Sequence, residues 1–119
     1  MSSPIKTKLA QPVPELPVAD VEKAQTYYRD ILGFDVAWIY PDKSIGAVGR
    51  DGIAIFLSKQ NNISPNAHWI FAVDIDATYQ EMKLRNTNIT EEIDDKPWRL
   101  RQFTIEDLDG NKFTFHHDL

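Results

Sequence analysis

The chain contains no cysteine. This absence excludes disulfide bonds, thiolate nucleophiles and zinc or iron–sulfur sites that depend on cysteine ligands. Long hydrophobic runs are also missing, because no apolar stretch approaches the roughly 20 residues that a membrane-spanning helix needs. The amino-terminal sequence MSSPIKTKLAQPVP lacks the apolar segment and cleavage site of a secretory signal. We therefore expect a cytoplasmic protein without a membrane segment.

The chain has few positive charges: it contains 13 lysine and arginine residues but 18 aspartate and glutamate residues, which gives a net charge of −5. Such an acidic chain disfavours nucleic acid as a partner and, where charge matters for binding, favours a cationic one. Several enzyme motifs are absent as well: the nucleophile elbow G-x-S-x-G, the P-loop and the G-x-G-x-x-G fingerprint. None of the common hydrolytic or nucleotide-binding motifs is therefore present.

A length of 119 residues with 42% apolar residues is typical of one globular domain. Within it the order of elements repeats, and we predict one βαβββ module at about 8–59 and a second at about 67–117, with an Asn-rich linker between them. Asp20 is the predicted N-cap of the first helix and Gly33 its C-cap. The predicted helices extend to 32 and over 76–86, and the predicted strands are 11–18, 34–40, 44–49, 53–58, 68–73, 89–93, 99–106 and 112–116.

The last two strands form a strong hairpin signal. Two alternating runs, Gln102–Glu106 and Lys112–His116, flank the sequence Asp-Leu-Asp-Gly-Asn. The Asp109-Gly110 pair supplies the positive φ that a tight turn demands, and the flanking Phe, Thr and Ile residues suit a half-buried sheet. We therefore predict a β-hairpin at the carboxyl end of the chain.

Taken together, PVADVEKAQTYYRDILGFDV at 17–36, HWIFAVDID at 68–76 and RQFTIEDLDGNKFTFHH at 101–117 resemble the vicinal oxygen chelate superfamily. This superfamily includes glyoxalases, extradiol dioxygenases, fosfomycin-resistance enzymes and bleomycin-resistance proteins. The resemblance implies a single α+β domain, in which two βαβββ modules form a curved mixed sheet around a cleft. A ferredoxin-like sheet is the alternative, but it explains neither the third strand of each half nor the linker.

Metal-using members of the superfamily hold a divalent ion with His or Glu side chains on the cleft strands. The resemblance carries these positions to Val13, His68 and Thr114. Valine has no lone pair, and a single histidine with a neutral hydroxyl does not make up the three ligands that such an ion generally needs. A shifted set, Glu15, His68 and His116, has the right alternation but requires two strands to slip by roughly 6.6 Å. We therefore expect no metal or other cofactor.

Acidic pairs occur at Glu91-Glu92, Asp94-Asp95 and Glu106-Asp107. Neighbouring acids on a strand point to opposite faces and are usually solvated, although together they would form a rim that attracts cations. Glu81 and Arg85 are spaced for an ion pair on the surface of the second helix.

Aromatic residues on several strands supply the remaining candidates for a binding site. Trp98 follows an exposed loop, and PWRLRQF resembles the W-G-x-R-x-F start of the same strand in bleomycin-resistance proteins, with Arg99 in place of the glycine. Trp38 lies on an inner strand, where we expect it to share a face with Val36 and Tyr40. Trp69 is predicted to pack against the helices, on the face opposite His68. The candidate ligand-binding residues are Trp38, Tyr40, His68, Trp98, Arg101, Thr114 and His116.

These observations favour a metal-free homodimer of the bleomycin-resistance type, which sequesters a planar, partly cationic small molecule such as a bleomycin-type antibiotic. Stacking on aromatic faces and nearby carboxylates would suffice for such binding. Two alternatives stay open: a divalent-metal lyase, isomerase or dioxygenase of the glyoxalase type, and a ligand-sensing accessory domain without turnover.

Overall fold

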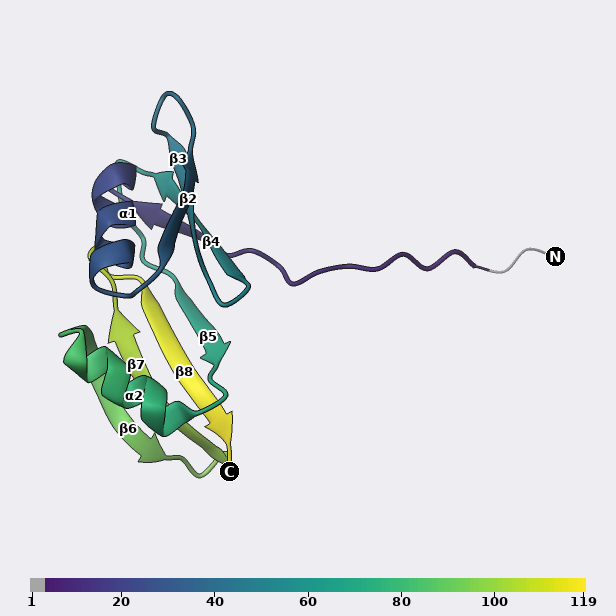
Figure 1. The fold of residues 1–119 in the computed structure, drawn as a ribbon, viewed down its shortest axis with the longest axis vertical. Helices are drawn as coiled ribbons and strands as arrows, with labels where there is room; N and C mark the ends of the chain where they lie inside the picture. The colour runs from purple at the N-terminus through teal and green to yellow at the C-terminus, as the bar shows by residue number, and fades with distance from the viewer. Residues whose placement is uncertain (1–3) are drawn as a thin grey trace.

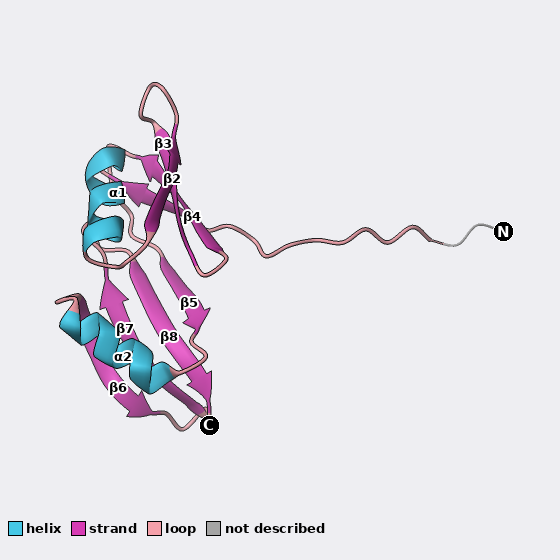
Figure 2. Cartoon of the chain, viewed as in Figure 1, coloured by secondary structure: helices cyan, strands magenta, loops and turns pink. Residues whose placement is uncertain are grey.

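A computed structural model describes residues 4–119 and contains two βαβββ modules, each with a four-stranded sheet covered on one face by one helix (Figures 1 and 2). The sheet orders are β1-β4-β3-β2 and β5-β8-β7-β6, and no strand pairing joins the two described sheets. The first module comprises β1 (Glu15–Val18), α1 (Val21–Asp30), β2 (Asp35–Ile39), β3 (Ile45–Arg50) and β4 (Ile53–Lys59). The second comprises β5 (Ala67–Phe71), α2 (Ile75–Leu84), β6 (Asn88–Asp95), β7 (Leu100–Glu106) and β8 (Lys112–Asp118). The predicted α+β fold is confirmed, and a single ferredoxin-like sheet does not fit.

Alternation along the strands separates a buried face from an exposed one in each sheet. In the first sheet Leu16, Val18, Ile55 and Leu57 point toward α1 and are fully buried. In the second, Phe103, Ile105, Phe113 and Phe115 pack toward α2. We call the opposite face of each sheet its open face, because no helix among residues 4–119 covers it.

Both helices begin with the same cap. The side chains of Asp20 and Asp74 accept hydrogen bonds from the backbone N–H groups of Lys23 and Ala77, which satisfies a free donor at each helix start. The helix α1 ends at Asp30 with Ile31 as its C-cap, two residues before the predicted cap Gly33, whose φ is +75°. The first strand is shorter than expected, because prolines at 12 and 14 lack the N–H group that strand pairing needs.

The turn between β7 and β8 connects the two modules. The Asp107 carboxylate accepts a hydrogen bond of 2.6 Å from the Tyr28 hydroxyl of α1, and Asn111 donates to the carbonyl of Pro17 in β1 at 2.9 Å. Ala19 donates its backbone N–H to Asp109 at 3.0 Å. Burial and the neighbouring Asp107 carboxylate raise the pKa of Tyr28 well above its usual range. The expectation that the Glu106-Asp107 pair is merely solvated is therefore wrong for Asp107, which is buried.

A second contact between the modules involves charge. Arg50 of β3 donates two hydrogen bonds of 2.6 and 2.7 Å to the Glu81 carboxylate of α2. Arg85 adds the predicted i, i+4 pair at 2.6 Å. The hydrogen bonds from Arg50, reinforced by Arg85, lower the pKa of Glu81 to about 2. Glu81 thus links α2 to Arg50 of the first sheet, and it also pairs with Arg85 directly after α2.

Between the modules lies a groove of about 1030 Å³, lined by β5, β8, α2, the start of β4 and residues 11–14. Residues 4–14 have no regular secondary structure, and the part of this segment before residue 11 extends away from both modules (Figure 1). Ile5 and Leu9 on this segment, and Val73 after β5, are almost fully exposed. No helix among the described residues has the length and apolar character to cross a membrane.

Candidate functional site

A chain of hydrogen bonds fixes an indole on the open face of the second sheet. Trp98, in the turn between β6 and β7, donates its Nε1–H to the side-chain oxygen of Gln102 at 2.8 Å. Gln102 then donates to the Glu91 carboxylate of β6 at 3.1 Å. Gln102 is only 4% exposed, whereas Trp98 is 57% exposed. The buried amide therefore positions an aromatic surface that faces solvent.

The same open face continues across β7, β8 and β5. The hydroxyl groups of Thr104 and Thr114 share a hydrogen bond of 2.9 Å, and Trp69 lies directly opposite Thr114 in the parallel register. The ring of His116 contacts Trp69 edge-on at 5.6 Å and Phe71 at 5.7 Å. This part of the face combines hydroxyl groups with exposed rings, an arrangement suited to a flat ligand with polar edges.

The structure reverses the expected faces of His68 and Trp69. His68 lies opposite the buried Phe113, on the helix side of β5, and its Nε2 atom has no hydrogen-bond partner among the described residues. Trp69 is 57% exposed on the open face. The cause is the register of the second module: Asp74 caps α2 as Asp20 caps α1, so the position equivalent to Val13 is Ala67.

Arg101 also lies away from the open face. Its guanidinium donates hydrogen bonds to Asp76 at the start of α2, and to Asp95 at the end of β6, at 2.9 Å in each case. Because alternate residues of β7 point to opposite faces, Arg101 shares the helix side with Phe103. It supports the packing of α2 and does not join the candidate site.

Arg99 explains how the Trp98 turn keeps its shape. Its φ is +71°, the left-handed region that favours glycine. The glycine that follows this tryptophan in bleomycin-resistance proteins is thus replaced by an arginine in a conformation that glycine adopts readily. The turn is closed by hydrogen bonds from Arg99 to Lys96 and from Lys96 to Leu100.

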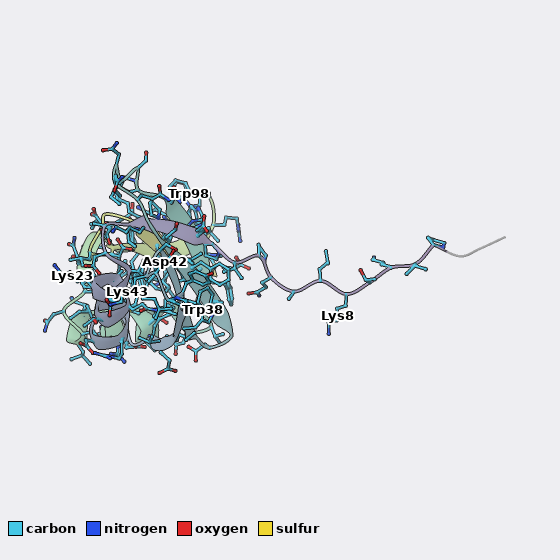
Figure 3. All side chains as sticks on the ribbon, turned by 90° about the horizontal axis from the view of Figure 1, so that it is seen from above. Lys8, Lys23, Trp38, Asp42, Lys43 and Trp98 are labelled. Atoms are coloured by element: carbon cyan, nitrogen blue, oxygen red, sulfur yellow. The ribbon has the colours of Figure 1, made fainter. Side chains whose placement is uncertain are left out.

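Trp38 lies on β2 of the first sheet, far from Trp98 (Figure 3), and Tyr40 directly follows the end of β2. Trp38 is opposite Ala47 and contacts Phe56 at 5.4 Å on the open face. A bulge in β2 separates the pairings of Val36 and Trp38, so Val36 lies opposite the buried Val48. The expectation that Val36 shares the face of Trp38 is therefore wrong. Within the described chain, no hydrogen bond or ring contact brings Trp38 and Trp98 together.

The residues at the family's metal positions do not fit a divalent ion. Val13 and Ala67 have no donor atom in their side chains, and the Thr114 hydroxyl is neutral and already bonded to Thr104. The shifted set fails as well, since His68 lies on the helix side of β5. Among residues 4–119, no three His, Asp or Glu side chains gather closely enough to hold a metal ion.

A protein-family model described as the Glyoxalase/Bleomycin resistance protein/Dioxygenase superfamily matches residues 9–115. The chain belongs to this superfamily. The search of curated proteins gave no match to the chain. Superfamily members of known structure nevertheless share its fold over nearly the whole length.

One such structure is a bleomycin-binding protein from bleomycin-producing Streptomyces verticillus, complexed with copper(II)-bleomycin. It is 24% identical, with a TM-score of 0.75, and the match covers 92% of this chain and 97% of that one. TioX from Micromonospora sp. ML1 is 19% identical, with a TM-score of 0.79 and coverage of 92% and 100%. Lactoylglutathione lyase from Agrobacterium tumefaciens is 15% identical, with a TM-score of 0.72 and coverage of 92% and 95%. The superfamily fold thus serves both a binding protein and an enzyme.

Several residues of the site were not among the sequence candidates. Gln102 and Glu91 hold Trp98, and Thr104 pairs with Thr114. A signal for two of them was present: Gln102 and Thr104 alternate with Phe103 and Ile105, which marks a polar row behind an apolar one. A row of polar residues on a strand that has a neighbouring strand on each side indicates polar groups held on the open face.

Proposed function

We propose that this protein binds a planar, partly cationic small molecule on its open faces and sequesters it without chemical change. The observation that carries the proposal is the fixed and exposed indole of Trp98, held by the Gln102–Glu91 hydrogen bonds beside hydroxyl groups. A flat ligand would stack on such an indole while its polar edge meets the threonine row. Stacking of this kind contributes about 0.5 to 1.5 kcal/mol beyond the area buried.

The charge around this indole supports a cationic ligand. Glu91 of β6 accepts from Gln102, and Asp94 lies opposite Gln102 in the strand register, whereas Glu92 and Asp95 are bonded to Tyr79 and Arg101 on the helix side. Carboxylates near an aromatic face favour a positive group through both Coulomb attraction and the ring quadrupole. The fold shared with a protein complexed with copper(II)-bleomycin supports a bleomycin-type antibiotic as the ligand to test first.

We further propose that the binding cleft forms between the subunits of a homodimer. Trp38 of the first module and Trp98 of the second lie apart within one chain (Figure 3). A symmetric partner would bring the first-module face of one subunit over the second-module face of the other, which would wall the cleft on both sides. Exposed apolar residues at the edge strand β5 support association, since Phe71 is 54% and Val73 is 86% exposed.

The enzyme alternative is a metal-dependent lyase, isomerase or dioxygenase. The fold shared with a lactoylglutathione lyase favours it. The residues at the family's metal positions argue against this alternative, because valine and alanine offer no donor atom and threonine offers only a neutral hydroxyl. We therefore place binding ahead of turnover.

The test is a fluorescence and calorimetric titration with copper(II)-bleomycin and with metal-free bleomycin. Comparing the two ligands separates quenching caused by stacking on the indole from quenching caused by the copper ion. We expect saturable quenching of indole fluorescence with both. Trp98→Ala should weaken binding by about 1 to 3 kcal/mol and leave the thermal midpoint unchanged. Trp98→Phe, which keeps a flat ring, should retain most of the affinity. Equal affinity of the wild type and Trp98→Ala would contradict the proposed site.

A further inference from the structure

Lys96 places its own ammonium group over the indole of Trp98, 5.9 Å from the ring centroid. The same nitrogen lies 3.8 Å from the Glu91 carboxylate and 3.9 Å from that of Asp94. The lysine side chain is only 19% exposed, although it belongs to a hairpin turn where water is close. A strongly hydrated ammonium adopts such a position where surrounding groups replace its water. The indole of Trp98 and the carboxylates of Glu91 and Asp94 therefore define a subsite for positive charge, which Lys96 occupies.

Two walls of this subsite are held without the help of Lys96. Gln102 accepts from the Trp98 indole and donates to Glu91, so a single buried amide sets both the ring and the carboxylate. The backbone at Lys96 is fixed as well, since its N–H donates to the Leu100 carbonyl at 2.8 Å. Removing the lysine side chain would thus leave the indole and the carboxylate in place.

The ammonium itself is held loosely. Distances of 3.8 and 3.9 Å to the carboxylate oxygens exceed hydrogen-bond length, and an ion pair of this kind is worth little near solvent. The lysine side chain is flexible, and its charge gains full hydration when it swings outward. Two carboxylates facing one ammonium also leave one negative charge in excess. A ligand cation would meet a site that is already shaped for it and only weakly occupied.

We propose that Lys96 is a tethered competitor, which fills the cation subsite of Trp98, Glu91 and Asp94 until the positive group of a ligand displaces it. This inference rests on the proposed ligand-binding function and names the ligand's chemical class: a flat aromatic system with an ammonium, ring-nitrogen cation or guanidinium close to the ring. The lysine makes the site select for cations that bind better than a tethered primary amine.

The experiment compares a planar cation with its neutral counterpart on matched variants. The probes are N-methylacridinium and, at mildly alkaline pH, uncharged acridine. Lys96→Met keeps the length of the side chain and removes its charge. Lys23→Met removes one charge from the exposed surface of α1, at a distance from Trp98 (Figure 3), and so controls for the change in net charge. Affinities are measured by calorimetry on full-length protein.

We expect Lys96→Met to bind N-methylacridinium about threefold to fivefold more tightly than the wild type. Acridine should bind both proteins equally, and Lys23→Met should match the wild type with either probe. Adding Glu91→Gln to Lys96→Met should remove the gain. If Lys96→Met binds the cation and the wild type does not, this result would also support the inference, because the lysine would then block the subsite completely.

Three results would overturn the inference. Unchanged or weaker cation binding by Lys96→Met, with measurable binding by the wild type, would remove Lys96 as a competitor and leave the proposed function intact. An equal gain in Lys23→Met would assign the effect to net charge. No binding of either probe, or of bleomycin, by any variant would overturn both this inference and the proposed function.

Discussion

Exposed indoles on the second sheet are the residues on which the account depends most. Trp69 and Trp98 each leave 57% of their surface exposed, whereas Phe103 in the same sheet is fully buried between Tyr79 and Phe115. Burial of a large aromatic ring contributes several kcal/mol to folding, so rings left exposed beside polar groups contribute little to stability. Their exposure is better explained by a ligand or a partner that covers them.

This difference gives a stability prediction. Trp69→Ala should lower the free energy of unfolding by at most about 1 kcal/mol, because the indole is more than half exposed. Phe103→Ala should lower it by about 3 to 5 kcal/mol through loss of a packed core ring. Urea unfolding of the two variants against the wild type measures both values. A loss for Trp69→Ala as large as that for Phe103→Ala would place Trp69 in the core.

The faces of some strand residues follow from local sequence, and those of others do not. Trp98 and Thr114 lie on the open face as expected, because the turn and the alternation around them are local features. His68 does not, since its face depends on which aspartate caps α2, and both Asp74 and Asp76 follow β5. Val36 was misplaced because a bulge breaks the alternation of β2. Neither the cap choice nor the bulge has a distinct signature in the sequence.

At the scale of elements, the turn between β7 and β8 does more than reverse the chain. Asn111 is fully buried, donates to Pro17 of β1, and accepts from the backbone N–H of Asn66 at 2.9 Å. It therefore ties the first module, the linker and the final hairpin at one point. The sequence predicted the hairpin from Asp109-Gly110, but not these long-range bonds, because nothing local specifies the partner of a buried amide.

We predict that Asn111→Ala lowers the free energy of unfolding by about 2 to 3 kcal/mol, because it empties a fully buried position and removes the hydrogen-bond partner of the Pro17 carbonyl and of the Asn66 N–H. Leu108→Ala in the same turn is the control. Leu108 is 56% exposed, so its loss should cost less than about 0.5 kcal/mol. Chemical denaturation of both variants tests the prediction, and a similar small cost for both would show that the turn does not fasten the modules.

The contact between α2 and β3 should make stability depend on pH. The pKa of Glu81 is about 2 in the folded protein, below its ordinary value of 4.5. A lowered folded-state pKa contributes stability above the unfolded pKa, and this contribution is lost as the pH falls toward the folded pKa. Glu81→Gln should therefore cost about 1 to 2 kcal/mol near neutral pH, with the difference from wild type shrinking between about pH 5 and pH 2.

The comparison is made by urea unfolding across that pH range. Asp30→Asn is the control, because the Arg29–Asp30 pair is exposed on both sides and should contribute little to stability at any pH. A constant difference between Glu81→Gln and wild type at all pH values would mean that the loss is one of packing and not of charge.

At the scale of the whole molecule, one chain leaves its two open faces apart and the edge strand β5 uncovered. A symmetric homodimer would cover this edge and bring the two faces together. We predict a dimer by sedimentation equilibrium at micromolar concentration. Phe71→Glu, at the exposed edge, should shift the equilibrium toward monomer, and Leu108→Glu, equally exposed in the β7–β8 turn, should not. A monomeric wild type would contradict a cleft shared between subunits.

The family fold could be predicted from three sequence segments, because caps, alternation and the Asp-Gly turn all point to two βαβββ modules. The function could not be predicted from the fold and had to be inferred from the residues of the candidate site. The same fold appears in a bleomycin-binding protein and in a lactoylglutathione lyase, so the residues at a few positions decide between binding and metal chemistry.

The metal content of untagged protein tests the central claim most directly. With valine at 13, alanine at 67 and threonine at 114, the account predicts no stoichiometric Zn, Ni, Mn or Fe by elemental analysis, and a thermal midpoint that chelator does not change. A metal that binds the folded state would add its binding free energy to stability, and its removal would lower the midpoint. One equivalent of tightly held metal per chain, with a midpoint that falls on chelation, would contradict the account.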